Sequence, residues 1–306
     1  MEIIRPGTNF DFIGKKTYAL IISCFLIVIG AVSLIVHGGP RYGIDFAGGL
    51  LVQVKFSQNV TAEEIKEKLK PINLEGSIVQ QFEEKGKHEF LIQTTGSAID
   101  TENLDTILTD TLAQGFGAEN FEIRRVEMVG PKVGKDLRRK GMLSVFYAVI
   151  FMLIYITWRF EFRFGVGAII ALIHDVAITV GIFSLVNLEI SLPIIAAFLT
   201  IVGYSINDTI VVYDRIRENR RKNPRDPLTK TINTSINETL SRTILTSATT
   251  LLVVLSLFIF GGGVIHNFAF ALLIGVIIGT YSSVYIASPV LIFWEKIYQK
   301  TKKKRR

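Results

Sequence analysis

Long hydrophobic runs separated by shorter polar connections make up most of this 306-residue chain. Six of these runs approach the roughly 20 apolar residues that a helix needs to cross a bilayer. We place them at 17–36, 142–158, 164–186, 190–213, 241–261 and 267–290. The pattern therefore predicts a polytopic α-helical membrane protein with six transmembrane helices.

Residues 37–141 follow a different pattern and are too polar to lie in lipid. Apolar runs with strand character alternate with helical patterns, and Thr61 and Glu64 have the spacing of a capping box at the first helix. We predict strands at 50–56, 77–83, 88–94 and 121–129, helices at 61–70 and 101–117, and a hairpin turn at 84–87. The order βαββαβ is typical of an α+β ferredoxin-like domain.

The net charge of +7 is distributed unevenly among the connections. The tails 1–16 and 291–306 and the connection 214–230 are basic, whereas "NLEIS" and "GGGVIHN" carry no Lys or Arg. Basic connections usually face the cytoplasm, so both termini are expected there and the domain 37–141 outside. The basic stretch "PKVGKDLRRKG" (131–141) conflicts with this topology. We interpret the other basic clusters as topology signals and contacts with anionic lipid, not with nucleic acid.

Features of an enzyme active site are missing from the sequence pattern of the outer domain. Residues 37–141 show no metal-ligand spacing, no nucleophile with a base and no phosphate-binding glycine loop. The single cysteine, Cys24, excludes an intrachain disulfide, and the first apolar run continues without a cleavage site, as expected for a retained helix. We predict neither a covalent reaction nor a cofactor or metal.

Three charged residues lie within the predicted spans: Asp175, Asp208 and Arg242. A charge at the bilayer centre costs at least about 2.5–3.5 kcal/mol, so such residues tend to face the bundle interior with a partner. Asp208 and Arg242 fall at similar depth in two antiparallel spans, as a static ion pair or as a protonatable carboxylate with a basic partner. The polar residues predicted to line this site are Tyr204, Ser205, Asn207, Thr246 and Thr249.

Asp175, near the middle of the third span, fits either a second proton-relay station or a helix-packing hydrogen bond. His174 beside it points about 100° away around an ideal helix, and we interpret it as a satisfied interior residue. Small residues recur every fourth position in the sixth span, a spacing that permits close helix contact. They are Ala271, Gly275, Gly279, Ser283 and Ala287.

The segment "YGIDFAGG" (42–49) lies where the first span meets the outer domain. Its glycines permit tight turns, and Asp45 can cap a turn. We interpret it as a structural junction.

Three segments together, "YGIDFAGG", "ALIHDVAITVG" and "VGYSINDTIVVYDRIRENRR", closely resemble the SecD/SecF family of protein-export membrane proteins, within the resistance-nodulation-division superfamily. The resemblance covers essentially the full length. It implies a bacterial inner-membrane subunit that uses the proton motive force in late steps of preprotein translocation. It also implies SecD, the SecYEG translocon, YajC and YidC as partners, and a proton path through residues matching Asp208 and Arg242.

Two other functions remain open at this point. One is half of a small-molecule/proton antiporter of the same superfamily, although such chains are typically far longer. The other is a scaffold that stabilises the export complex without transducing energy. A scaffold tolerates Asp208→Asn, whereas a proton-coupled machine assembles with this substitution but loses its stimulation of export.

Overall fold

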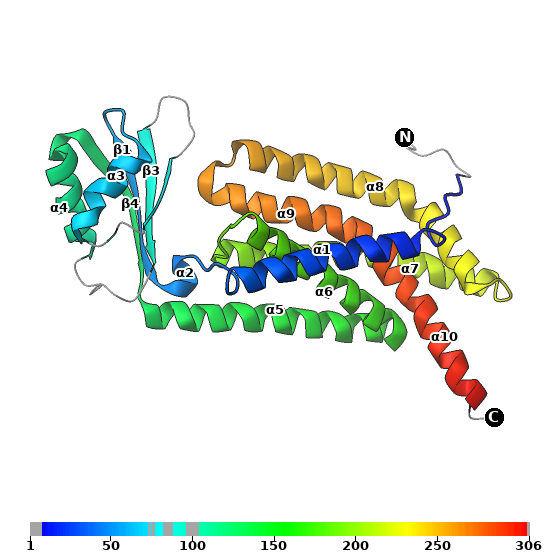
Figure 1. The fold of residues 1–306 in the computed structure, drawn as a ribbon. Coiled ribbons are helices and arrows are strands. Elements are labelled where there is room, and N and C mark those ends of the chain that lie inside the picture. Colours follow the sequence, from blue (N-terminus) through cyan, green and yellow to red (C-terminus); the bar gives the residue numbers. More distant parts are fainter. Residues whose placement is uncertain (1–7, 73, 75–76, 82–87, 96–103, 305–306) are drawn as a thin grey trace. The chain divides into compact units, whose positions relative to one another are not determined.

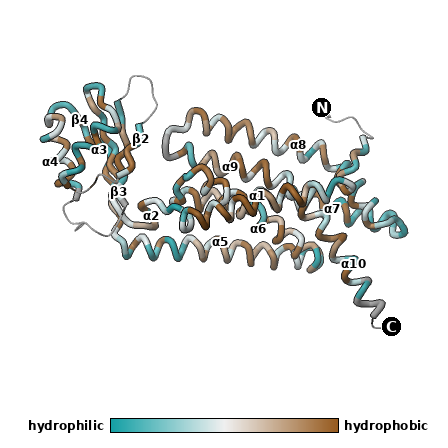
Figure 2. The backbone as a smooth tube through the Cα atoms, viewed as in Figure 1, coloured by the Kyte–Doolittle hydropathy of each residue, from teal (hydrophilic) through white to brown (hydrophobic). Residues whose placement is uncertain are grey.

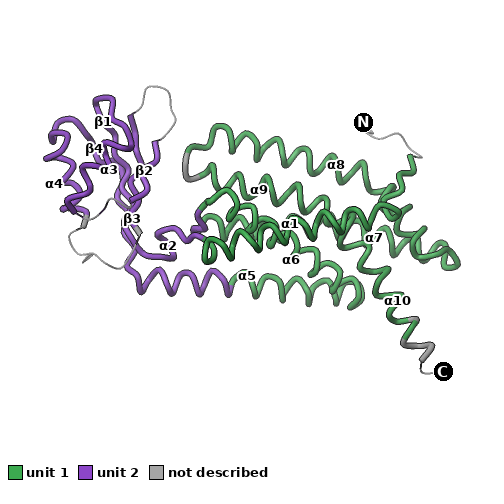
Figure 3. The backbone as a smooth tube through the Cα atoms, viewed as in Figure 1, with its two compact units in different colours: residues 1–40, 144–188, 193–306 green, residues 41–143, 189–192 purple. Residues whose placement is uncertain are grey.

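The computed structural model describes residues 8–72, 74, 77–81, 88–95 and 104–304 (Figure 1). The chain divides into two compact units, drawn in different colours in Figure 3. Unit 1 contains residues 1–40, 144–188 and 193–306. Unit 2 contains residues 41–143 and, from the connection between two later helices, residues 189–192.

Long helices make up unit 1, and Figure 2 shows hydrophobic residues running along most of them. The described part of the chain contains six helical segments that are long and apolar enough to cross a membrane, which confirms the predicted fold class. They are α1 (Lys16–Val36), α5 (Pro131–Arg159), α6 (Phe162–Leu185), α7 (Leu192–Lys222), α8 (Leu228–Phe260), and a sixth formed by α9 (Gly262–Ser282), a π-helical turn (Ser283–Ala287) and α10 (Ser288–Lys304).

Several helices extend beyond the apolar runs, as Figure 2 shows by the hydrophilic colour where α7 and α8 join. Helix α5 begins at Pro131, so the basic stretch 132–140 forms its first turns. Arg138 lies over the Tyr42 ring at 5.1 Å and Lys140 pairs with Asp136 at 2.8 Å. The charged side chains lower the hydropathy of this stretch. The helix continues through it because Lys and Arg are good helix formers.

Small residues allow close contact between helices of unit 1. A Cβ atom added to Gly30 of α1 would lie 2.7 Å from the Cα atom of Gly181 in α6. A Cβ atom on Gly279 of α9 would lie 2.9 Å from the Cβ atom of Ser205 in α7. The small-residue spacing predicted for the sixth span therefore serves helix packing at Gly279.

Unit 2 is built on a four-stranded sheet with the strand order β2-β3-β1-β4. All three strand pairs are antiparallel. The elements are β1 (Gly49–Phe56), α3 (Ala62–Leu69), β2 (Ile78–Gln81), β3 (His88–Thr95), α4 (Leu104–Phe116) and β4 (Phe121–Val129). This confirms the βαββαβ order and the ferredoxin-like topology. The predicted hairpin turn at 84–87 lies outside the described residues.

One face of this sheet forms the core of unit 2. Alternate residues of β1 are buried, and they pack with Ile65 and Leu69 of α3 and Leu108 and Leu112 of α4. At the start of α3, the Glu64 N–H donates to the Thr61 hydroxyl and the Thr61 N–H donates to the Glu64 carboxylate, at 3.3 and 2.9 Å. The predicted capping box is therefore present.

Candidate functional site: two buried carboxylates in unit 1

Asp208 lies in the middle of α7 and is 3% exposed. The Ser247 hydroxyl of α8 is 3.4 Å from Asp208 Oδ2 and 2.7 Å from the Thr280 hydroxyl of α9. Thr280 in turn donates to the Val276 carbonyl at 2.8 Å. A short row of hydroxyl groups therefore leads from the carboxylate across three helices.

Arg242 does not form the predicted ion pair with Asp208. Its side chain is exposed, although it lies near enough for its charge to act on Asp208. Between these two described residues the structure contains no salt bridge. On α8, Thr243 and Ser247 form the buried face, and Arg242 lies one position outside it. Sequence spacing gives the depth of a residue in a helix but not the rotation of that helix against its neighbour.

Only part of the predicted polar lining surrounds Asp208. The Tyr204 hydroxyl, one turn earlier on α7, is buried and has no hydrogen-bond partner among the described residues. The Thr246 hydroxyl donates to the Arg242 carbonyl of its own helix at 3.1 Å and also lies within reach of the Asp208 carboxylate. Asn207 and Thr249 are exposed, so they are not among the buried groups around Asp208.

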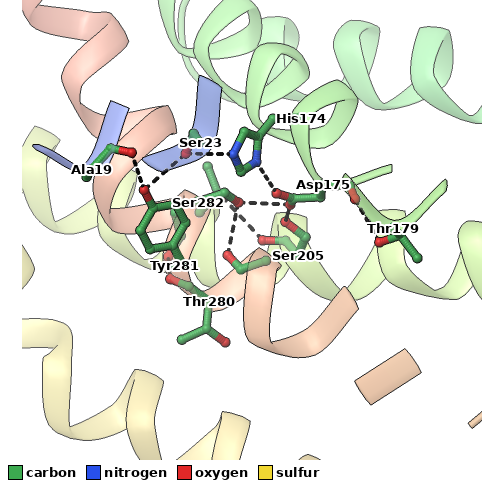
Figure 4. A network of polar contacts seen from close by, with 12 residues as sticks. Ala19, Ser23, His174, Asp175, Thr179, Ser205, Thr280, Tyr281 and Ser282 are labelled. Carbon is green, nitrogen blue, oxygen red and sulfur yellow. Dashed lines mark hydrogen bonds and ion pairs between the residues drawn. The ribbon is translucent and has the colours of Figure 1, made fainter. Parts of the chain in front are cut away.

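A second carboxylate, Asp175 of α6, is completely buried and accepts three hydrogen bonds. Figure 4 shows Ser205 and Ser282 converging on it. Ser205 of α7 and Ser282 of α9 donate to Oδ2 at 2.6 and 2.8 Å, and His174 Nδ1 lies 2.8 Å from Oδ1. Ser205, predicted to line the Asp208 site, thus belongs to this second centre.

His174 extends the Asp175 centre to α1. Its Nε2 atom lies 3.0 Å from the Ser23 hydroxyl, which lies 3.0 Å from the Tyr281 hydroxyl (Figure 4). Tyr281 donates to the Ala19 carbonyl at 2.6 Å. His174 is an interior residue as predicted, but its ring turns toward Asp175 rather than away. A neighbour offset by about 100° around the helix reaches the carboxylate through its side-chain rotamer.

The π-helical turn lies directly after Ser282. Ser288 donates to the Ser283 carbonyl at 2.8 Å, and the fully buried Tyr213 of α7 donates to the Ala287 carbonyl at 3.0 Å. A π-helical turn shifts the hydrogen-bond register of a helix, and such turns are frequent at functional sites. These two hydroxyls satisfy carbonyl groups within this turn.

In unit 2, the segment 41–48 binds residues 189–192. Gly43 N–H donates to the Ile190 carbonyl at 3.0 Å, and Ile190 N–H donates to the Arg41 carbonyl at 2.7 Å. Arg41 also pairs with Glu189 at 3.2 Å. Asp45, in the short helix α2 (Ile44–Ala47), accepts a hydrogen bond from Leu192 at 2.8 Å. Asp45 therefore caps α7, a longer-range role than the local turn that its sequence context predicts.

Sequence reasoning missed an amide-rich contact at the start of α8. Asn233 and Asn237, one turn apart, bind the backbone of the N-terminal segment. The Phe12 N–H donates to Asn233 Oδ1 at 2.9 Å, and Asn237 Nδ2 donates to the Phe10 carbonyl at 2.9 Å. Two asparagines at i and i+4 on a helix that begins before the apolar run are the signal that could have indicated this contact.

Two family models match the chain. Residues 109–297 match "Protein export membrane protein SecD/SecF, C-terminal", and residues 33–60 match the "SecD/SecF GG Motif". The second match contains the segment 41–48 that binds residues 189–192. Residues 109–297 contain both buried carboxylates.

Curated relatives and solved structures agree with these models. The chain is 45% identical to protein translocase subunit SecF of Desulfurispirillum indicum, over 94% of this chain and 92% of the relative. It is 46% identical to SecF of Magnetococcus marinus, over 96% and 95%. The crystal structure of SecDF, a translocon-associated membrane protein from Thermus thermophilus, matches with a TM-score of 0.82 and 37% identity, over 95% of this chain and 39% of that chain.

Proposed function

This chain belongs to the SecD/SecF family of protein-export membrane proteins as a SecF-type translocase subunit, and we propose that it couples proton movement through unit 1 to polypeptide export. Its counterpart in SecDF occupies 39% of a longer chain. We propose that SecD supplies the remainder of that assembly. The complex then works beside the SecYEG translocon, with YajC and YidC as further partners, on unfolded preprotein.

Asp208 and its hydroxyl row carry this proposal. Three contacts, Asp208–Ser247, Ser247–Thr280 and Thr280–Val276, are served by only two hydroxyl hydrogens. When Asp208 is ionised, Ser247 donates to it, and Thr280 can donate to Ser247 or to the carbonyl but not to both. When Asp208 is protonated, the acid supplies the third hydrogen and all three contacts can form. The geometry therefore suits a protonated Asp208, and loss of that proton breaks the pattern.

Arg242 supplies the partner for the other state of the cycle. Burial favours the neutral acid, and a nearby guanidinium favours the anion. When Asp208 releases its proton, the resulting carboxylate attracts Arg242, which requires α8 or its side chain to turn toward α7. The unpaired arrangement described here then corresponds to the protonated state. Each proton that crosses a potential of 100 mV releases about 2.3 kcal/mol, enough to shift such an equilibrium.

Asp175 serves as an anchor rather than as the moving acid. Its three hydrogen bonds join α6 to α7 and α9, and His174 continues the contact to α1. A buried carboxylate with this many donors is well satisfied and holds its neighbours in register. It thus ties α7 to α6 and α9 at Ser205, less than one turn from Asp208, so that α7 moves as one body with these helices relative to α8.

Residues 189–192 transmit that movement. They precede the body of α7 in the chain and are hydrogen-bonded within unit 2, so a shift or rotation of α7 pulls on unit 2 through Leu192 and Ile190. Unit 2 then moves against a polypeptide that emerges from the translocon. In this proposal unit 2 lies outside the inner membrane, and both termini lie in the cytoplasm.

The contact between the N-terminal segment and α8 supports this topology. Phe10 and Phe12 bind Asn233 and Asn237, close in sequence to the basic connection between α7 and α8. The basic connection and the N-terminal segment therefore lie at the same end of unit 1. Because basic connections favour the cytoplasmic side, this end is assigned to the cytoplasm.

The deciding experiment measures proton-gradient-dependent export in inner-membrane vesicles that carry the chain with Asp208→Asn. Complex assembly with SecD is measured in parallel by co-purification. We expect normal assembly and loss of the gradient-dependent part of export. The matched control is Asp214→Asn, in the same helix, whose carboxylate is 47% exposed and pairs with Arg159.

The two alternatives give different results in this assay. Normal export with Asp208→Asn would favour a scaffold and refute the coupling. Export that stays intact in the vesicles, together with loss of small-molecule resistance measured separately in cells, would favour an antiporter half-unit. Assembly that fails with Asp208→Asn but not with Asp214→Asn would show that Asp208 acts in folding.

A further inference from the structure

A cavity of about 190 Å³ lies where the ends of α6, α7, α8 and α10 meet. This is several times the volume of one water molecule, about 30 Å³. Apolar side chains, including Phe164, Ile216 and Leu291, form part of its wall. The rest of the wall is charged, with the arginines 163, 217, 220 and 221 and the glutamates 161 and 295.

The charges in this cavity are unequally compensated. Both glutamates pair with Arg163, at 2.8 and 3.8 Å. Arg217 and Arg220 instead donate to backbone carbonyl groups, of Arg159 at 3.4 Å and of Asp226 at 2.6 Å. The Arg221 side chain makes no ion pair or hydrogen bond with the described residues. Three guanidinium groups thus line one cavity without a carboxylate partner.

These arginines stand on one face of α7 because residues 217, 220 and 221 are spaced at i, i+3 and i+4. Their basic neighbours on the same helix do have carboxylate partners, since Arg215 pairs with Glu218 and Glu238 and Lys222 pairs with Glu218. A planar guanidinium binds phosphate oxygens through two parallel hydrogen bonds. The chemistry of the cavity therefore fits a phosphate group.

The cavity lies at the level expected for the membrane–water boundary. The two tryptophans of the chain both lie at this end, Trp158 in the last turn of α5 and Trp294 in α10. Trp158 is 85% exposed, and Trp294 packs edge-on against Phe162 at the start of α6. Tryptophan is enriched at this boundary. A ligand here can place a phosphate in the cavity and acyl chains along the exposed helix faces.

We propose that this cavity binds the phosphate headgroup of an anionic phospholipid. Basic pockets between transmembrane helices on the cytoplasmic side are suited to such headgroups. The apolar wall and the boundary position favour a lipid over a soluble phosphate ester, which has no apolar part to bury.

Native mass spectrometry of the purified protein tests the proposal with phosphatidylglycerol and phosphatidylcholine in equal amounts. We expect wild type to retain phosphatidylglycerol preferentially. In Arg217→Gln/Arg221→Gln, which keeps the Arg220–Asp226 contact that closes the α7–α8 turn, we expect the preference to fall by about fivefold per arginine. The control Arg225→Gln removes an exposed arginine of the same turn and should keep the preference.

A third sample contains glycerol phosphate in place of lipid. Failure of glycerol phosphate to bind, or to displace phosphatidylglycerol, supports the lipid headgroup. Displacement at comparable concentration would assign the site to a soluble anion and overturn the proposal. Equal retention of both lipids by wild type, or equal preference in wild type and the double variant, would also overturn it. None of these readouts depends on export, so the result is separable from proton coupling.

Discussion

The Asp45 carboxylate accepts a hydrogen bond of 2.8 Å from the backbone N–H of Leu192, the first residue of α7. Removal of a helix-capping acceptor costs about 0.5–2 kcal/mol. We therefore expect Asp45→Ala to open the first turn of α7 and to speed amide hydrogen exchange at Leu192 and Ile194 by about two- to thirtyfold. Hydrogen exchange measured by mass spectrometry on the complex checks this expectation.

The control for Asp45 is Asp136→Ala, in α5, where an exposed carboxylate pairs with Lys140 and with no other residue in the described part of the chain. If residues 189–192 transmit movement, Asp45→Ala also lowers gradient-dependent export while assembly is retained. Unchanged exchange at Leu192 would mean that Asp45 does not cap α7 in solution. Faster amide exchange at Leu192 with full gradient-dependent export would mean that Asp45 caps α7 but that this cap is not needed for coupling.

Ser247→Ala should weaken proton-coupled export without affecting assembly. The hydroxyl is the link between Asp208 and Thr280, at 3.4 and 2.7 Å, and a typical hydrogen bond contributes about 1 kcal/mol. We expect gradient-dependent export to fall severalfold, and Ser247→Thr to restore part of it. Thr249→Ala is the control, since its hydroxyl is exposed and donates only to carbonyls of its own helix. Equal export by Ser247→Ala and the control would exclude the hydroxyl row from the proton path.

Gly279→Ala should destabilise unit 1. The added Cβ atom would lie 2.9 Å from the Cβ atom of Ser205, and overpacking of this kind costs about 1–3 kcal/mol. We expect a lower thermal midpoint in detergent. Gly203→Ala, on α7 with open space around its added Cβ atom, should leave the midpoint unchanged or raise it. A midpoint for Gly279→Ala at or above that of wild type would show that the helices adjust at no cost.

Asp175→Ala should lower the thermal midpoint more than any other change proposed for unit 1. It leaves the Ser205 hydroxyl and the His174 Nδ1 atom buried without their partner, at about 1–3 kcal/mol for each unpaired group, whereas the Ser282 hydroxyl keeps the Gly279 carbonyl as an acceptor. Asp175→Asn retains an acceptor oxygen and should cost less. If Asp175→Asn keeps the wild-type midpoint but abolishes gradient-dependent export, Asp175 is a relay station and the anchor role is wrong.

Hydropathy and periodicity predict the membrane helices and the α+β domain well. Strand β4 has the predicted bounds, 121–129, because its pattern is local and is bounded by glycines at 117 and 130. The ends of the long helices are predicted less well. Pro131–Gly141 and Arg215–Lys222 are charged yet helical, because apolar windows detect the lipid-facing part of a helix and not the helix itself.

The buried carboxylates illustrate what sequence spacing leaves open. Asp208 is identifiable as a charge inside an apolar run, but its contact with Ser247 rather than Arg242 depends on the rotation of α8. The His174–Asp175 contact depends on a rotamer, and the Asp45–Leu192 contact joins residues distant in sequence. Such contacts are set by tertiary packing, and the hydrophobic periodicity of a single sequence does not reveal them.

The π-helical turn at Ser283–Ala287 determines which side chains of α10 face the other helices. An α-helix advances about 100° per residue, and a π-helical turn takes up one extra residue at nearly unchanged rotation. The same residues wound as regular α-helix would therefore rotate α10 around its axis by roughly 100°. Leu291 and Glu295 would then leave the wall of the arginine-lined cavity, and Tyr213 would lose the Ala287 carbonyl. The extra residue of the π-helical turn thus determines the rotation of α10 about its axis relative to the Asp175 centre.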